Sequence, residues 1–192
     1  YYLSAAGLCS MRLTASGVED RRILSSGAEG VPYGLANGLD VSSDGRVFFS
    51  DTFHRRFPKG SLMDDMRTHV VIGGEPTGRL MEYDPATGKT TVLLRNLRFA
   101  NGVAVSPDNT FVIIGETFAA KLWRVWISGE RQGQSEQFGP TLPAMPDNLH
   151  SDGDFLYVAC PLPRNLITYT SLHTSWRRWL AAKLPPVEVG SD

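Results

Sequence analysis

Three asparagines recur along the chain at similar places, and their side chains are the first candidates for chemistry. Asn37, Asn101 and Asn148 each precede a short predicted strand that leads into an Asp-containing tight turn. Asp147, directly before Asn148, adds a carboxylate. Amide and carboxylate oxygens suit a hard cation, and Ca²⁺ accepts such ligands in a more flexible geometry than Mg²⁺ does. Asn37, Asn101, Asp147 and Asn148 are therefore candidate ligands of one calcium ion.

Asparagine before a strand also has a purely structural role, because its side chain can cap the backbone of a turn. One such residue would carry no functional meaning, whereas three at similar places beside an Asp favour a shared site. The sequence has no Cys/His cluster of the kind that binds zinc. Its two cysteines, Cys9 and Cys160, can form one disulfide at most or remain unpaired thiols.

Residues for nucleophilic or acid–base catalysis are few. The sequence contains no Gly-x-Ser-x-Gly nucleophile elbow. His150 lies two residues after Asn148 on a predicted strand, which makes it a candidate general base, although a lone histidine is more often structural. Asp51 and Glu116 end similar strands, and hydrogen bonds between blades are the expected role of both.

Composition limits the class of protein. The 192 residues carry a formal net charge of -1, with 42% hydrophobic and 20% charged residues. This balance is typical of a folded globular chain, and without a basic excess we expect no nucleic-acid partner. No apolar run approaches the roughly 20 residues that span a bilayer. The sequence before residue 7 has no initiator Met and no signal-peptide pattern, so it reads as mid-domain sequence.

The elements that must position the asparagines form a repeat. Each repeat has an Asn, a short strand, a tight turn and an apolar β-rich strand, over residues 36–51, 100–116 and 146–160. The turns carry residue pairs that tolerate a positive φ, namely Asp44-Gly45, Asp108-Asn109 and Asp152-Gly153. Further strands are predicted between the repeats, at 78–84, 89–94 and 121–127, and before them at 7–13 and 21–24.

Units of four antiparallel strands predict the blades of a β-propeller. The innermost strand of each blade lines the central channel, so residues at the start of that strand converge near the axis. At roughly 40 to 50 residues per blade, the chain makes about four blades. An open arc of four blades would leave unpaired strand edges and a half-covered core, and the chain begins and ends inside blades, so the sequence predicts a partial propeller domain over residues 1–192 with blades missing at both ends.

Two segments depart from the repeat. Asn37 and Asn101 are 64 residues apart, whereas Asn101 and Asn148 are 47 apart, and the excess falls in an insertion over 53–77. This insertion is either a solvated surface loop or a border of the active-site mouth. The sequence of residues 173–184 predicts a short C-terminal helix. Packing of this helix on a blade is favoured over a role as a lid or as a contact with the membrane interface.

Several of these segments resemble the strictosidine synthase-like family, especially its adipocyte plasma membrane-associated protein branch. The resemblance extends from about residue 7 to the Trp-rich segment near residue 179. It rests on the order and spacing of Ala36-Asn37-Gly38-Leu39-Asp40-Val41, Phe48-Phe49-Ser50-Asp51, Gly78-Arg79-Leu80-Met81-Glu82-Tyr83-Asp84, Leu97-Arg98-Phe99-Ala100-Asn101-Gly102-Val103 and Met145-Pro146-Asp147-Asn148.

The resemblance implies a six-bladed propeller related to paraoxonases and gluconolactonases. In the lactonase relatives, residues at the places of Asn37, Asn101 and the Asp147-Asn148 pair bind a catalytic Ca²⁺. A further acidic ligand and the paraoxonase-type histidine would lie upstream of Tyr1. The glutamate of true strictosidine synthases would fall near or beyond Asp192, and no motif supports Glu188 in that role.

Three functions follow as hypotheses. The first is a calcium-dependent esterase or lactonase of the arylesterase type. The second is a Pictet–Spengler-type condensing enzyme that joins an amine to an aldehyde, and the third is a catalytically silent propeller that serves as an interaction scaffold. The expected partners are a small-molecule ester, lactone, amine or aldehyde. By resemblance, the protein is expected in the endomembrane system, secreted or anchored to a membrane through an N-terminal segment.

Overall fold

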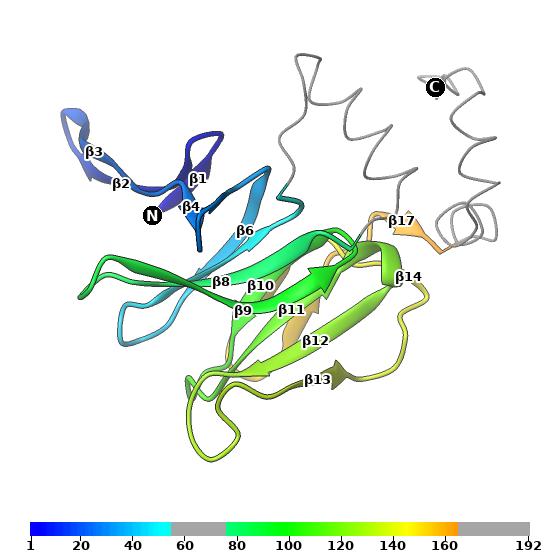
Figure 1. Ribbon diagram of the computed structural model, residues 1–192. Coiled ribbons are helices and arrows are strands. Elements are labelled where there is room, and N and C mark those ends of the chain that lie inside the picture. The colour runs from blue at the N-terminus through cyan, green and yellow to red at the C-terminus, as the bar shows by residue number, and fades with distance from the viewer. Residues whose placement is uncertain (55–75, 165–192) are drawn as a thin grey trace, which may run out of the picture.

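The computed structural model describes residues 1–54 and 76–164, and their regular structure is almost entirely β-strand (Figure 1). The one helical element among them is a single 3-10 turn, η2 (Thr117–Ala119). Most of the predicted insertion over 53–77 and all of the predicted helix over 173–184 lie outside the described residues. Within the described ranges, no helix is long and apolar enough to cross a membrane.

Two complete blades form the centre of the structure. Each is a four-stranded antiparallel sheet in which strands neighbour one another in chain order, so the predicted blade architecture is confirmed. The first comprises β6 (Ala36–Val41), β7 (Val47–Asp51), β8 (Gly78–Asp84) and β9 (Lys89–Leu97). The second comprises β10 (Ala100–Val105), β11 (Phe111–Glu116), β12 (Lys121–Trp126) and β13 (Ser135–Phe138).

Smaller sheets flank these blades on either side. A three-stranded sheet precedes them and a two-stranded hairpin follows, which gives four successive units and agrees with the predicted number. The preceding sheet has β1 (Tyr2–Ser4), β2 (Gly7–Thr14) and β3 (Gly17–Ser25), and the hairpin has β15 (Leu149–Ser151) and β16 (Leu156–Val158). Two short pairs join β4 (Gly27–Ala28) to β5 (Val31–Pro32) and β14 (Ala144–Met145) to β17 (Leu162–Pro163).

The inner hairpins of the two blades repeat in register. Ala36 pairs with Asp51 and Ala100 with Glu116, and in both blades the register then shifts before pairing resumes. The turns also match, because Gly45, Asn109 and Gly153 have φ values of 87°, 55° and 108°. The Asp-Gly and Asp-Asn signals of the sequence therefore form the positive-φ turns that were predicted.

Apolar cores lie between neighbouring blades, and β7 contributes to two of them. Phe48 belongs to a cluster with Val103 and Ile114 of the following blade, whereas Phe49 packs with Leu8 of the preceding sheet. Alternate residues of a strand point to opposite faces, so a strand buried on both faces reads as a continuous apolar run. The innermost strands of successive units are neighbours, with β1 beside β6, β6 beside β10 and β10 beside β15.

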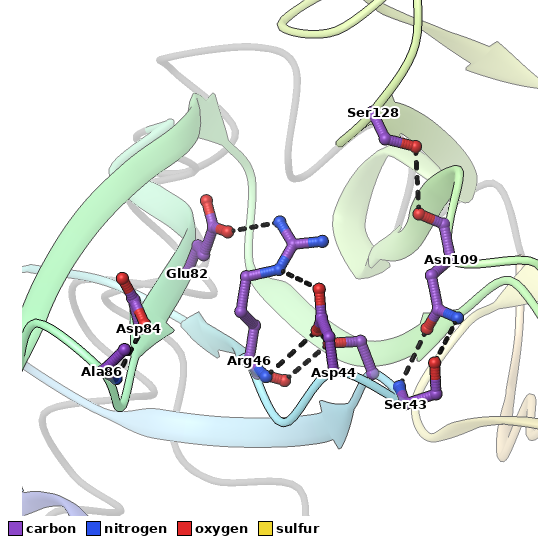
Figure 2. Close-up of polar contacts among 9 residues, drawn as sticks. Ser43, Asp44, Arg46, Glu82, Asp84, Ala86, Asn109 and Ser128 are labelled. Atoms are coloured by element: carbon purple, nitrogen blue, oxygen red, sulfur yellow. Dashed lines mark hydrogen bonds and ion pairs between the residues drawn. The ribbon is translucent and has the colours of Figure 1, made fainter.

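Polar contacts tie the two blades together at their turn end. Figure 2 shows Asn109, in the turn between β10 and β11, facing Ser43 in the turn between β6 and β7. The Ser43 amide N–H donates to Asn109 Oδ1 at 2.9 Å, and Asn109 Nδ2 donates to Ser43 Oγ at 2.7 Å. Nearby, Asp40 Oδ2 accepts a hydrogen bond from the Val105 amide at 2.8 Å. These contacts fix one blade against the next.

Asp51 and Glu116 bind the segment that enters their own blade, whereas the sequence predicted hydrogen bonds between blades for both. Asp51 is fully buried, accepts hydrogen bonds from the amides of Gly34 and Leu35, and pairs with Arg79 at 2.7 Å. Glu116 accepts from the Arg98 amide at 2.9 Å and from Trp123 Nε1 at 2.7 Å. Both carboxylates hold the connection to their own innermost strand.

Candidate metal centre

Three of the predicted ligands line one cavity. Asn37 on β6, Asn101 on β10 and Asp147 just before β15 come from three successive units and border a cavity of about 290 Å³. Asn101 is buried, Asp147 is half-buried, and Asn37 is exposed at the edge. The structure therefore brings together side chains that are up to 110 residues apart in the sequence, from Asn37 to Asp147.

The amide of each asparagine is oriented by a threonine. Asn101 Nδ2 donates to Thr117 Oγ1, and Asn37 Nδ2 donates to Thr52 Oγ1, both at 3.2 Å. The Thr117 hydroxyl has a single hydrogen, which it donates to the Pro146 carbonyl at 2.7 Å. It can therefore only accept from Asn101, and this requirement fixes which end of the amide is nitrogen and which is oxygen.

The Asn101 amide oxygen is left without a partner. Its Oδ1 atom is buried and has no hydrogen bond to any of the described residues. An unpaired buried acceptor costs about 1–3 kcal/mol, so native structures seldom leave one unless an ion or water satisfies it. An oxygen of this kind, on a cavity shared with a carboxylate and a second amide, fits the ligand set of Ca²⁺.

The position equivalent to Asn101 is held by Asp147, one residue away from the predicted Asn148. Thr52 Oγ1 donates to the carbonyl of Ala100, and Thr117 Oγ1 donates to the carbonyl of Pro146. The residues that follow these two carbonyls are Asn101 and Asp147. Asn148 takes the place of Gly102, is exposed, and is not among the residues that line the cavity. Its role as an added ligand stays a prediction.

The glycines that follow Asn37 and Asn101 permit the convergence. A Cβ atom on Gly38 would lie 2.8 Å from the Asn101 carbonyl oxygen. A Cβ atom on Gly102 would lie 2.4 Å from the Asp147 carbonyl oxygen, to which the Gly102 amide donates at 2.9 Å. No side chain fits at either place, because such contacts are far shorter than van der Waals distances. The close approach of the neighbouring strands therefore requires the glycine of each Asn-Gly pair.

Two phenylalanines form an apolar wall beside the polar groups. The rings of Phe99 and Phe118 lie 4.7 Å apart between centroids, and both residues line the cavity together with Met145. Phe99 has a φ of 66°, an unusual conformation for a bulky residue that costs about 1–3 kcal/mol. Strain of this kind is held only where surrounding contacts impose it, and here the Thr117 amide donates to the Phe99 carbonyl at 3.1 Å.

The sequence reasoning missed these threonines and phenylalanines. A signal was present, because Asp51-Thr52-Phe53 and Glu116-Thr117-Phe118 repeat an acid-Thr-Phe triplet at the end of equivalent strands. Thr52, Phe53 and Thr117 are buried.

His150 lies on β15 apart from the cavity lining. It is exposed and sits opposite Tyr157, with the ring centroids 6.2 Å apart and the ring planes 24° from parallel. The described residues contain no group of three or more His, Cys, Asp or Glu side chains that could hold a metal. Cys9 is buried, Cys160 is exposed, and both are free thiols. Neighbouring atoms nevertheless desolvate the Cys160 thiol, and together with the Asp147 charge they raise its pKa.

The sequence is similar to known proteins over most of its length. Residues 37–130 match the strictosidine synthase family model. The chain is 38% identical over 161 residues to STRICTOSIDINE SYNTHASE-LIKE 10 of Arabidopsis thaliana, covering 82% of this chain and 41% of the relative. It is 40% identical over 116 residues to the adipocyte plasma membrane-associated protein of Salmo salar, covering 60% and 26%.

Among solved structures, a gluconolactonase from Xanthomonas campestris superposes with a TM-score of 0.56 at 17% identity, covering 78% of this chain and 48% of its own. That likeness, with the blades described above, shows that the chain has the fold of part of a six-bladed β-propeller. The chain belongs to the strictosidine synthase-like family. The curated relatives match most of this chain, but the chain spans only about two fifths of their length.

Proposed function

We propose that Asn37, Asn101 and Asp147 bind Ca²⁺ at the propeller axis, and that the whole protein is a calcium-dependent hydrolase of small esters or lactones. The observation that carries the proposal is the buried, unpaired Oδ1 of Asn101 on a cavity shared with Asp147. A bound Ca²⁺ supplies a Lewis acid that polarises an ester carbonyl and stabilises negative charge on its oxygen.

The residues of the chain prepare this chemistry. Asp147 contributes a negative charge that attracts a cation, and the two asparagines contribute neutral oxygens that need no proton to be released. Their amide nitrogens are already bonded to threonines, so the oxygens require no reorientation when a cation binds. Preorganised polar groups of this kind are a main source of electrostatic catalysis.

The apolar side of the cavity favours an apolar substituent on the substrate. Phe99, Phe118 and Met145 would contact the group next to the carbonyl, and an aryl or alkyl ester suits this surface better than a polyhydroxylated sugar lactone does. We assign no catalytic base among the described residues. By family resemblance, we place it in the part of the relatives that this chain does not span.

We also propose that the whole protein associates with membranes, because relatives from salmon and rat are named for the plasma membrane. Fractionation of cells that express the tagged full-length protein tests this proposal. Recovery in the membrane pellet supports it, and recovery in the soluble fraction alone contradicts it.

The calcium-dependent function is tested with Asn101→Ala and Asp147→Ala in the full-length protein. Thermal unfolding with and without Ca²⁺ measures binding, because a ligand that binds the native state raises its stability. Phenyl acetate hydrolysis measures activity. We expect both variants to lose the calcium-dependent stabilisation and the hydrolysis. Asp154→Ala, which removes an exposed carboxylate of the same hairpin, is the matched control and should keep both. If both site variants behave like the unsubstituted protein, the proposal fails.

A further inference from the structure

Two buried threonines hold the same place in successive blades. Thr52 follows the end of β7 and Thr117 follows the end of β11, and the two residues are 1% and 7% exposed. Each hydroxyl accepts from the asparagine amide of its own blade and donates to a backbone carbonyl of the next unit. The second bond is the shorter one, at 2.8 Å for Thr52 and 2.7 Å for Thr117.

These bonds join the candidate ligands into one chain. Thr52 connects Asn37 to the carbonyl of Ala100, whose peptide bond leads directly to Asn101. Thr117 connects Asn101 to the carbonyl of Pro146, whose peptide bond leads directly to Asp147. The path therefore runs through three successive units, and every ligand is linked to the next one by a threonine.

We infer that Thr52 and Thr117 are positioning residues of the cation site, an inference that rests on the calcium-dependent function proposed above. Each sets the orientation of one amide, because its only hydrogen is donated to a carbonyl and its lone pair must then receive the amide N–H. Each also fixes the backbone immediately before the next ligand. Neither hydroxyl needs to touch the cation for its loss to weaken binding.

Valine in place of threonine removes the hydroxyl and keeps the shape of the side chain. In Thr117→Val, the Asn101 amide loses its acceptor, so the fixed choice between nitrogen and oxygen facing the cavity is lost. The Pro146 carbonyl also loses its donor, which frees the backbone before Asp147. Partners that orient metal ligands without touching the metal typically change affinity by about 10- to 100-fold.

The test is a Ca²⁺ titration by calorimetry of the full-length protein carrying Thr52→Val, Thr117→Val or Thr117→Ser. We expect each valine variant to bind Ca²⁺ about 10- to 100-fold more weakly, and Thr117→Ser, which keeps the hydroxyl, to stay close to the unsubstituted protein. Thr90→Val is the matched control. It removes the hydroxyl that donates to Ser25 Oγ at 2.7 Å, away from the cavity, and should leave affinity unchanged.

Unfolding in the presence of EDTA separates positioning from general stability. A purely structural threonine would lower the apo melting temperature and leave calcium affinity unchanged, and that result in both valine variants would overturn the inference while the proposed function survives. If one valine variant does not fold, the other decides. If the unsubstituted protein binds no Ca²⁺, the proposed function and the inference fail together.

Discussion

Replacing Gly102 by alanine tests the convergence of the site directly. A Cβ at this position would lie 2.4 Å from the Asp147 carbonyl oxygen and 2.4 Å from the Leu149 amide nitrogen, whereas ordinary contacts begin near 3.4 Å. Both obstructing atoms are backbone, so the segment that carries Asp147 must move by about 1 Å, the difference between these two distances. Overpacking of this kind costs about 1–3 kcal/mol of stability.

The same displacement separates Asp147 from Asn101. An error of about 1 Å in a binding constellation can reduce activity about 100-fold, and we expect Gly102→Ala to lose Ca²⁺ affinity and phenyl acetate hydrolysis on that scale. Calorimetric titration and urea unfolding of the full-length protein measure the two effects. Gly115→Ala is the matched control, because its nearest neighbour would be 3.5 Å away and no loss is expected. Gly102→Ala with unchanged affinity and stability would refute the close approach described here.

Three further predictions concern the ion pair, the turns and the apolar wall. Arg79→Met leaves the buried Asp51 carboxylate without its ion pair and should cost about 3–5 kcal/mol in urea unfolding, whereas Arg95→Met, in an exposed pair with Glu29, should cost about 1 kcal/mol or less. The Ser42 hydroxyl holds the pKa of Asp44 below its ordinary value of 3.8, so this carboxylate stabilises the fold above pH 3.8 and its contribution is lost as the pH falls through the lowered pKa. Ser42→Ala should therefore make unfolding less sensitive to pH around and below 3.8, and an unchanged sensitivity would contradict this. Phe118→Ala should lower kcat/KM for phenyl acetate about tenfold relative to methyl acetate, since an aromatic contact contributes up to about 1.5 kcal/mol, and equal losses on both esters would argue against an aryl-binding wall.

The blades could be predicted from the sequence because their signals are local. Asp44-Gly45 and Asp108-Asn109 mark turns through backbone preferences that hold wherever they occur, and the apolar strands beside them follow from burial on both faces. Convergence of Asn37 and Asn101 also followed, because the innermost strand of every blade lines the same axis. These inferences need the repeat alone.

Other parts of the site depend on contacts between blades. Matching Asn with Asn placed Asn148 in the repeat, whereas the hydrogen bond to the Pro146 carbonyl shows that Asp147 holds that place. The threonines were not predicted, because a hydroxyl that bonds across two blades has no signature within one strand, and only the repeat of the acid-Thr-Phe triplet between strands marks them. Phe99 likewise owes its positive φ to contacts with the segment at Thr117, which no propensity anticipates.

A crystal structure of the full-length protein grown with Ca²⁺ tests the central claim most directly. The account predicts anomalous density for a calcium ion about 2.3–2.6 Å from Asn101 Oδ1, with the Asp147 carboxylate and the Asn37 amide oxygen in the same coordination sphere. Asn101 Oδ1 hydrogen-bonded to water or protein, with no ion on the cavity at millimolar Ca²⁺, would contradict it.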